Sequence, residues 1–157
     1  MHSRSKSGIS IGPIVVGVIA LVIVAVVAIL LINQAIPILQ VSGVSLSPTE
    51  ININSSANLQ FTIKNNDASN PHDVKVLFNV TSVTFYMNNV SLSKDNSGMQ
   101  YYNIQLQSSQ QSTYVFGVTG KLTGGASTST YLIRLDFYNE NLTKFDSETQ
   151  NLKVDSS

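Results

Sequence analysis

Hydrophobic and polar residues follow two contrasting patterns along this 157-residue chain. From Ile14 to Ile32 the sequence reads IVVGVIALVIVAVVAILLI, nineteen residues without a polar side chain. As an α-helix this run would be roughly 28 Å long, close to the ~30 Å hydrocarbon core of a bilayer. Because every backbone amide in lipid must be satisfied within its own segment, the pattern predicts a long hydrophobic transmembrane helix over residues 9–36.

After Gln40 the pattern changes to short runs in which apolar and polar residues alternate. Alternation with a period of two places apolar side chains on one face of a β-strand. The links between runs are too short for crossover helices, so consecutive strands should pair antiparallel. We therefore expect the helix to be followed by an all-β, immunoglobulin-like antiparallel sandwich over residues 41–157, with 37–40 as a linker. The residues expected to face inward include Leu59, Phe61, Ile63, Val74, Val76, Phe78, Val80, Val83, Phe85, Met87, Tyr102, Ile104, Leu106, Tyr114, Phe116 and Val118.

Charged residues are few and unevenly placed. Arg4 and Lys6 precede the apolar run, and no charged residue follows them until Glu50. The positive-inside tendency then predicts insertion in the plasma membrane with a cytoplasmic N-terminus and with the chain after Asn33 outside the cell.

The overall charge balance excludes some classes of protein. Charged residues make up 11% of the chain and the formal net charge is zero. That balance argues against a nucleic-acid partner, because phosphate binding needs a basic surface. The chain has no Cys, so it has neither disulfides nor a thiolate site. Its nine carboxylates have no evident partners, which predicts little change in stability between about pH 3 and 7.

A stripe of small residues runs along the predicted helix. Gly17, Ala20, Ala28 and Ala35 fall within about 80° of one another at 100° per residue. Such a stripe would let helices approach closely. Gly and Ala are also common in any membrane helix, so ordinary composition explains the stripe equally.

Candidate chemistry is sparse, and we expect no enzyme, no cofactor and no metal site. His72, the only histidine beyond the basic N-terminus, lies in the turn-like stretch ASNPHD and lacks the clustered ligands that a metal centre needs. The carboxylates of the C-terminal third would suit calcium if they converged. They are described equally well as polar strand edges and a hairpin loop; they are Asp136, Glu140, Asp146 and Glu148.

Four Asn-x-Ser/Thr sequons are candidate glycosylation sites, at Asn54, Asn79, Asn89 and Asn141. Chance alone would produce a similar number in a chain so rich in Asn, Ser and Thr. Aromatic residues at strand spacing, such as Tyr114 and Phe116, indicate core packing rather than a ligand-stacking surface.

The N-terminus resembles a known family. SRSKSG followed by ISIGPIVVGVIALVIVAVVAILL is similar to the class III signal peptide and hydrophobic N-terminus of archaeal type IV pilin-like proteins. The resemblance implies that a leader peptidase removes residues 1–8 by cutting between Gly8 and Ile9, with Lys6 as the basic determinant. It also implies that the retained helix packs into a filament core through an assembly machinery. Pro13 departs from the family, in which many members carry Ser-Pro-Ile directly after the cut.

The remainder of the chain resembles the CARDB type of immunoglobulin-like domain, in its order of strands and turns over residues 39–154. This resemblance implies a secreted binding or spacer module and carries no catalytic residues. Together the two resemblances imply a structural subunit of an adhesive extracellular filament, glycosylated on its surface, with the helix in the core and the β-domain as an outer sheath. The alternative is a permanently anchored surface sandwich that binds the cell envelope or supports another appendage.

Overall fold

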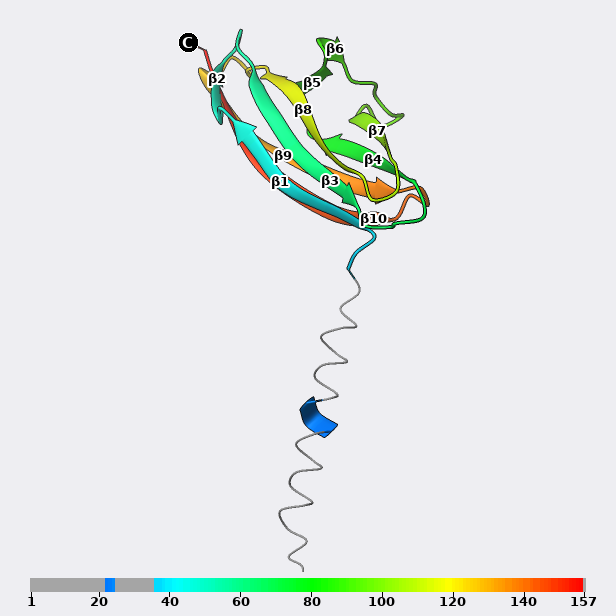
Figure 1. Ribbon diagram of the computed structural model, residues 1–157. Coiled ribbons are helices and arrows are strands. Elements are labelled where there is room, and N and C mark those ends of the chain that lie inside the picture. Colours follow the sequence, from blue (N-terminus) through cyan, green and yellow to red (C-terminus); the bar gives the residue numbers. More distant parts are fainter. Residues whose placement is uncertain (1–21, 25–35, 157) are drawn as a thin grey trace, which may run out of the picture. The chain divides into compact units, whose positions relative to one another are not determined.

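A computed structural model describes residues 22–24 and 36–156 of the chain (Figure 1). The chain divides into two compact units, Met1–Ile36 and Pro37–Ser157. Nearly all of the described structure belongs to the second unit, which contains ten β-strands.

The structure corrects the expectation of a long N-terminal helix. In the described part of the first unit only residues 22–24 are helical, and no described helix has the length and apolar character needed to cross a membrane. The prediction of a helix-plus-sandwich fold with a transmembrane helix was therefore wrong, and the described chain is nearly all β. The apolar run indicates that this segment prefers an apolar environment, but it does not by itself determine a secondary structure. Its Val and Ile residues have modest helix propensity, so only the assumed lipid favoured a helix.

The ten strands form two five-stranded sheets. The first sheet has the order β1-β3-β8-β5-β6 and the second has the order β2-β10-β9-β4-β7. The strands are β1 (Leu39–Ser47), β2 (Glu50–Asn52), β3 (Ala57–Asn65), β4 (His72–Asn79), β5 (Val83–Met87), β6 (Val90–Ser91), β7 (Gln100–Leu106), β8 (Gln111–Gly120), β9 (Thr128–Asn139) and β10 (Lys144–Asp155).

One strand pair departs from the expected antiparallel pairing. β2 pairs parallel with β10, with Glu50 opposite Lys153. Upstream, the Val44 carbonyl of β1 accepts a 3.4 Å hydrogen bond from Gln150 Nε2 of β10. Residue numbers in β1 and β2 therefore rise in the same direction as residue numbers in β10. The chain changes sheets between β1 and β2 without reversing direction, and that is why this one pair is parallel.

The core lies between the two sheets and is built by the alternating residues. Every inward position expected from alternation is either buried or packed against the buried cluster. Phenylalanine rings form its centre. The ring centroids of Phe61 and Phe137 lie 5.2 Å apart in an edge contact, and those of Phe78 and Phe85 lie 4.4 Å apart. Phe116 is also fully buried. The aromatic residues of the inner faces therefore serve packing, as their spacing predicted.

Candidate functional site

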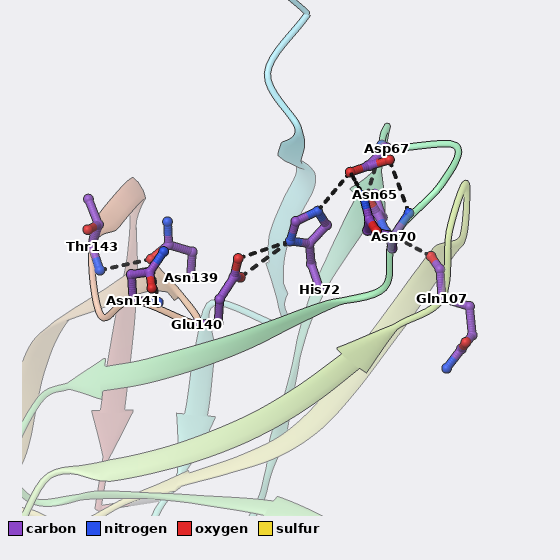
Figure 2. A network of polar contacts seen from close by, with 9 residues as sticks. All are labelled: Asn65, Asp67, Asn70, His72, Gln107, Asn139, Glu140, Asn141 and Thr143. Atoms are coloured by element: carbon purple, nitrogen blue, oxygen red, sulfur yellow. Dashed lines mark hydrogen bonds and ion pairs between the residues drawn. The ribbon is translucent and has the colours of Figure 1, made fainter.

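The end of the sandwich at which β1 begins joins segments that are distant in the sequence (Figure 2). Residues 37–39 meet the loop between β3 and β4, and the hairpin between β9 and β10 lies beside the first residue of β4. We call this set of contacts the entry network, because the chain enters the sandwich here. It is the densest polar network of the described residues and the candidate functional site.

Asn66 holds the entering chain directly. Its backbone N–H donates to the Ile38 carbonyl at 2.7 Å, and its Nδ2 donates to the Pro37 carbonyl at 2.8 Å. Leu39, the next residue, is buried in the core and pairs with Asn65 at the end of β3. Both backbone and side chain therefore fix the position of residues 37–39.

Asn65 fixes the loop that carries Asn66. Its side chain is fully buried, and Nδ2 donates to the carbonyls of Asn70 and Gln107 at 2.9 Å each. Its Oδ1 accepts a 2.9 Å bond from the Asp67 backbone N–H. The side-chain amide thus links the loop to the neighbouring β7–β8 connection, and its hydrogen bonds offset the cost of burying it.

Asp67, His72 and Glu140 continue the entry network across the strand end. Asp67 Oδ1 accepts backbone bonds from Ser69 and Asn70 at 2.7 and 3.1 Å. His72 Nε2 lies 3.3 Å from Asp67 Oδ2, and His72 Nδ1 lies 3.2 Å from Glu140 Oε1. Figure 2 shows the imidazole between the two carboxylates. The ring thus bridges the β3–β4 loop and the β9–β10 hairpin.

Both carboxylates are stabilised in their ionised form. The backbone N–H of Ser69, followed by the side chain and backbone of Asn70, holds the pKa of Asp67 well below its usual range. The pKa of Glu140 is lowered, chiefly by a hydrogen bond from its own backbone amide. Burial would raise this pKa, and the contact with His72 lowers it further. The network therefore retains its negative charges as the pH falls below the usual carboxyl range.

The arrangement holds three chain segments together and does not converge on a single point. The two His72 nitrogens face carboxylates on opposite sides of the ring, so the three side chains cannot direct their lone pairs at one ion. In the part of the chain that the structure describes, no group of three or more His, Asp or Glu side chains is placed to hold a metal. His72 is not the exposed loop residue that the sequence suggested: it begins β4 and its side chain is 14% exposed.

The four C-terminal carboxylates are not brought together. Asp136 lies on β9 and is only 1% exposed. Glu140 belongs to the entry network. Asp146 and Glu148 are on β10, and by alternation they lie on the opposite face from Ser147, which contacts Asp136. The structure therefore gives no support to a shared calcium site.

Asp136 instead forms a compact ionic cluster on the outer face of the second sheet. Its Oδ2 accepts bonds from Arg134 Nε and Nη2 at 3.0 and 2.9 Å. Its Oδ1 accepts bonds from Ser147 Oγ at 2.8 Å and Lys144 Nζ at 3.4 Å. Burial by itself would raise the pKa of Asp136, but the bonds from Ser147 and Arg134 and the two cationic charges outweigh it, so the pKa is lowered.

The candidate modification sites occupy different environments. Asn54, Asn89 and Asn141 are exposed, whereas Asn79 at the end of β4 is half-buried. Asn89 belongs to the two-residue turn between β5 and β6, where it and Asn88 both have positive φ. The leader positions Lys6, Gly8 and Ile9 lie outside the described residues. So do the small residues of the stripe: Gly17, Ala20, Ala28 and Ala35.

Sequence reasoning missed Asn65, Asn66 and Asp67. From the sequence, only ASNPHD is identified as turn-like and no prediction is made for NND directly before it, although Asn and Asp side chains commonly accept bonds from backbone amides two residues ahead. That local preference could have identified Asp67 and the Ser69 amide as partners. It could not have identified Pro37, Gln107 or Glu140, because these contacts cross long stretches of chain.

Comparison with known proteins gives no family. No protein-family model matches the chain, and no curated protein matches it. Among solved structures, it is similar to an alkylpurine DNA glycosylase, AlkC, from Pseudomonas fluorescens, with 13% identity and a TM-score of 0.44 over 75% of this chain and 31% of that one. A β-glucosidase from Listeria innocua matches with 16% identity and a TM-score of 0.42, over 74% of this chain and 16% of that one.

A third similar structure is the exo-chitosanase CsxA of Amycolatopsis orientalis, with 13% identity and a TM-score of 0.44 over 73% of this chain and 12% of that one. The chain thus spans less than a third of the length of each of these proteins. Similarities this weak carry no argument about activity.

Proposed function

We propose that this chain is a structural, non-enzymatic subunit of an extracellular type IV pilus-like filament at the cell surface, with the β-sandwich as its outer sheath. In this proposal copies of the chain associate with one another, and the apolar N-terminal sequence brings them together. The observation that carries the proposal is the entry network, which ties residues 37–39, at the start of the sandwich, to the β3–β4 loop. A subunit under mechanical tension needs its first residues held in this way.

The pairing of β1 supports a mechanical role. β1 pairs antiparallel with β3 from Leu39 opposite Asn65 to Ser47 opposite Asn58. Hydrogen bonds in an antiparallel pair are perpendicular to the strands. A pull along β1 would therefore load many of these bonds together rather than one after another. The two bonds from Asn66 to residues 37 and 38 add resistance at the first point to be loaded.

The interior of the sandwich also fits a passive structural role. In the described chain no buried side-chain nitrogen or oxygen lacks a hydrogen-bond partner. The hollow beside the entry network, between Ile38, His72 and Glu140, has a volume of ≈ 210 Å³, below the roughly 300–1,000 Å³ of small-molecule sites. A fully satisfied interior, and a hollow of this size at the entry network, fit a structural role for that network.

Electron microscopy of native cells tests the proposal. An antibody against the sandwich should label surface filaments along their length, and native protein isolated from them should begin at Ile9. The variant Asn66→Ala should give filaments that break into shorter pieces under mechanical shearing, because it loses the bond to Pro37. The matched control is Asn58→Ala, which removes an exposed amide from β3.

Three results would contradict the filament function or its carrying observation. Native protein found only in membranes, with Met1 intact, would favour the anchored surface sandwich. Labelled filaments in which Asn66→Ala and Asn58→Ala shear equally would remove the mechanical role of the entry network. Hydrolysis of a glycoside by the purified chain would contradict the non-enzymatic assignment.

A further inference from the structure

The outer strands of the two sheets differ in how their edges are protected. An edge strand exposes backbone groups that can pair with another chain, and proteins blunt such edges by shortness, charge, proline, bulges or coverage. β2 and β6 have only three and two residues. β1 is interrupted by a bulge between Ser42 and Ser45, and β10 approaches it through Gln150.

β7 has none of these protections along most of its length. It is seven residues long, with the sequence QYYNIQL, and contains no charged residue, Pro or Gly. It pairs with β4 in regular register and lies at the end of its sheet (Figure 1). Of the edge strands that the structure describes, β7 is therefore the one that is longer than three residues and pairs without a bulge.

The backbone groups that face outward from β7 can be identified. The Tyr101 N–H donates to the Ser93 carbonyl at 3.0 Å, so the backbone N–H and C=O of Tyr101 point away from β4. Because successive residues of a strand alternate in direction, Asn103 and Gln105 face away from β4 as well. Among the described residues, none outside β4 hydrogen-bonds to the backbone N–H or C=O of either one. At the next outward position, the Gln107 N–H already donates to Gln110 Oε1 at 2.6 Å.

We propose that β7 is a homotypic interface, which pairs antiparallel with β7 of a second copy of this chain. Asn103 lies opposite Gln105 of the second copy, and the two-fold axis passes between the two Ile104 residues. Each of the two symmetric Asn–Gln pairs exchanges two N–H···O bonds, about four in total. Only the two residues with open backbone groups take part, and Tyr101 keeps its bond to Ser93.

The open backbone groups favour this register over its neighbours. With Asn103 opposite itself, Gln105 would lie opposite Tyr101, whose N–H already donates to the Ser93 carbonyl. With Gln105 opposite itself, Asn103 would lie opposite Gln107, whose N–H already donates to Gln110 Oε1. The two outward amides can also hydrogen-bond across the strands, as complementary cross-strand pairs do. The edge is thus complementary to itself, which argues for a second copy as its occupant.

The inference goes beyond the proposed function and does not depend on it. A two-fold contact between sandwiches can join neighbouring subunits of a filament, and it can equally dimerise an anchored surface protein. If the filament function is disproved, the β7 interface can still exist. If the β7 interface is disproved, the filament function is unaffected.

Disulfide trapping in the full-length chain tests the interface, because the natural sequence has no Cys. The double variant Asn103→Cys with Gln105→Cys should form a covalent dimer on mild oxidation, seen by non-reducing electrophoresis. Opposed residues of a hydrogen-bonded pair lie about 5.5 Å apart between Cα atoms, within the disulfide range. The matched control is Asn58→Cys with Gln60→Cys, the same amides at the same spacing on β3, which β1 and β8 flank on both sides.

Charge variants test the register and remain decisive if the cysteine pair fails to fold. Asn103→Lys with Gln105→Lys sets ammonium groups opposite one another. It should raise the dissociation constant of the dimer roughly tenfold, as measured by sedimentation. Asn103→Lys with Gln105→Glu restores opposite charges in the same register and should recover dimerisation. A monomeric wild-type chain, equal trapping at β3 and β7, or an unaffected double-lysine dimer would overturn the proposal.

Discussion

At the scale of single residues, Asp136 shows how a charged group can be buried on the outer face of a sheet. Its carboxylate is 1% exposed because Arg134, Lys144 and Ser147 surround it and donate to both oxygens. The two cations themselves remain about half exposed, with side-chain exposures of 46% each. Their heads therefore keep contact with water, while the aspartate exchanges water for four donors.

Asp136→Asn keeps the shape of this side chain but removes its charge. Hydrogen bonds to charged groups contribute roughly 1.5–3 kcal/mol each, so we expect the free energy of unfolding at pH 7 to fall by about 1–3 kcal/mol. Urea unfolding measures this change. The control is Asp73→Asn, an exposed carboxylate of β4, which should cost less than about 0.5 kcal/mol.

The pH dependence of the same variant has a definite sign. The pKa of Asp136 is lowered in the folded chain, so its stabilising contribution is present above the unfolded value of about 3.9. It is lost as the pH falls through the folded pKa. The difference between wild type and Asp136→Asn should therefore hold from pH 7 to about 5 and shrink below about pH 4. A difference that stayed constant down to pH 2 would contradict the ionic account.

Lowered carboxyl pKa values also revise the expectation that stability is insensitive to pH between about 3 and 7. That expectation assumed unpaired carboxylates, but Asp67, Asp136, Glu140 and Asp155 all have partners and lowered pKa values. Their contribution is constant above about pH 5 and begins to decline near pH 4. The pairing depends on contacts between strands, so it was not visible in the charge count.

At the scale of elements, β8 shows how close packing restricts a strand. Gly117 and Gly120 lie on the same strand, but only Gly120 is buried. A Cβ at Gly120 would lie 2.6 Å from Val154 Cγ2, whereas the nearest atom to a Cβ at Gly117 would be Tyr86 Cβ at 3.8 Å. At Gly120 the backbone of β8 thus approaches Val154 of β10 more closely than a Cβ atom would allow.

Gly120→Ala should destabilise the fold by about 1–3 kcal/mol, because the added methyl group overpacks the core. Gly117→Ala is the matched control and should change stability by less than about 0.5 kcal/mol. Thermal unfolding followed by circular dichroism compares the two variants. Equal midpoints for both would show that Val154 can move aside at no cost.

At the scale of the whole molecule, the sandwich begins earlier than its alternating pattern suggests. Alternation placed the start of the β-domain at residue 41, with 37–40 as a linker. In the structure the compact unit begins at Pro37 and β1 at Leu39. Leu39 is 8% exposed, and the carbonyls of Pro37 and Ile38 accept bonds from Asn66. Residues 37–39 therefore contribute to the stability of the sandwich.

A fragment of residues 37–157 should fold with a β-rich circular dichroism spectrum and should be more stable than residues 41–157. The expected difference is about 1.5–3 kcal/mol, the contribution of one buried leucine. Leu39→Ala in the longer fragment should reproduce most of the loss. If both fragments unfold at the same denaturant concentration, the entry network does not stabilise the sandwich, and its proposed mechanical role loses its basis.

The sequence alone was sufficient to identify which residues face inward in β3, β4, β5, β7 and β8. Leu59, Phe61 and Ile63 alternate along β3, and all three are fully buried. Inward orientation can be predicted because it follows from the two-residue repeat of a strand, which is a local property. The prediction of an N-terminal helix was wrong because hydropathy indicates the environment of a segment, not its conformation. A helix followed from it only if the segment was assumed to lie in lipid.

The tertiary structure decided everything that depends on which strands become neighbours. It placed Arg134 and Lys144 around Asp136, and it set His72 between Asp67 and Glu140. It also left β7 as an open edge while covering or shortening the other edges. These features arise from contacts between residues far apart in the chain. Periodicity contains no information about such contacts, since strands with the same alternation can be ordered in a sheet in many ways.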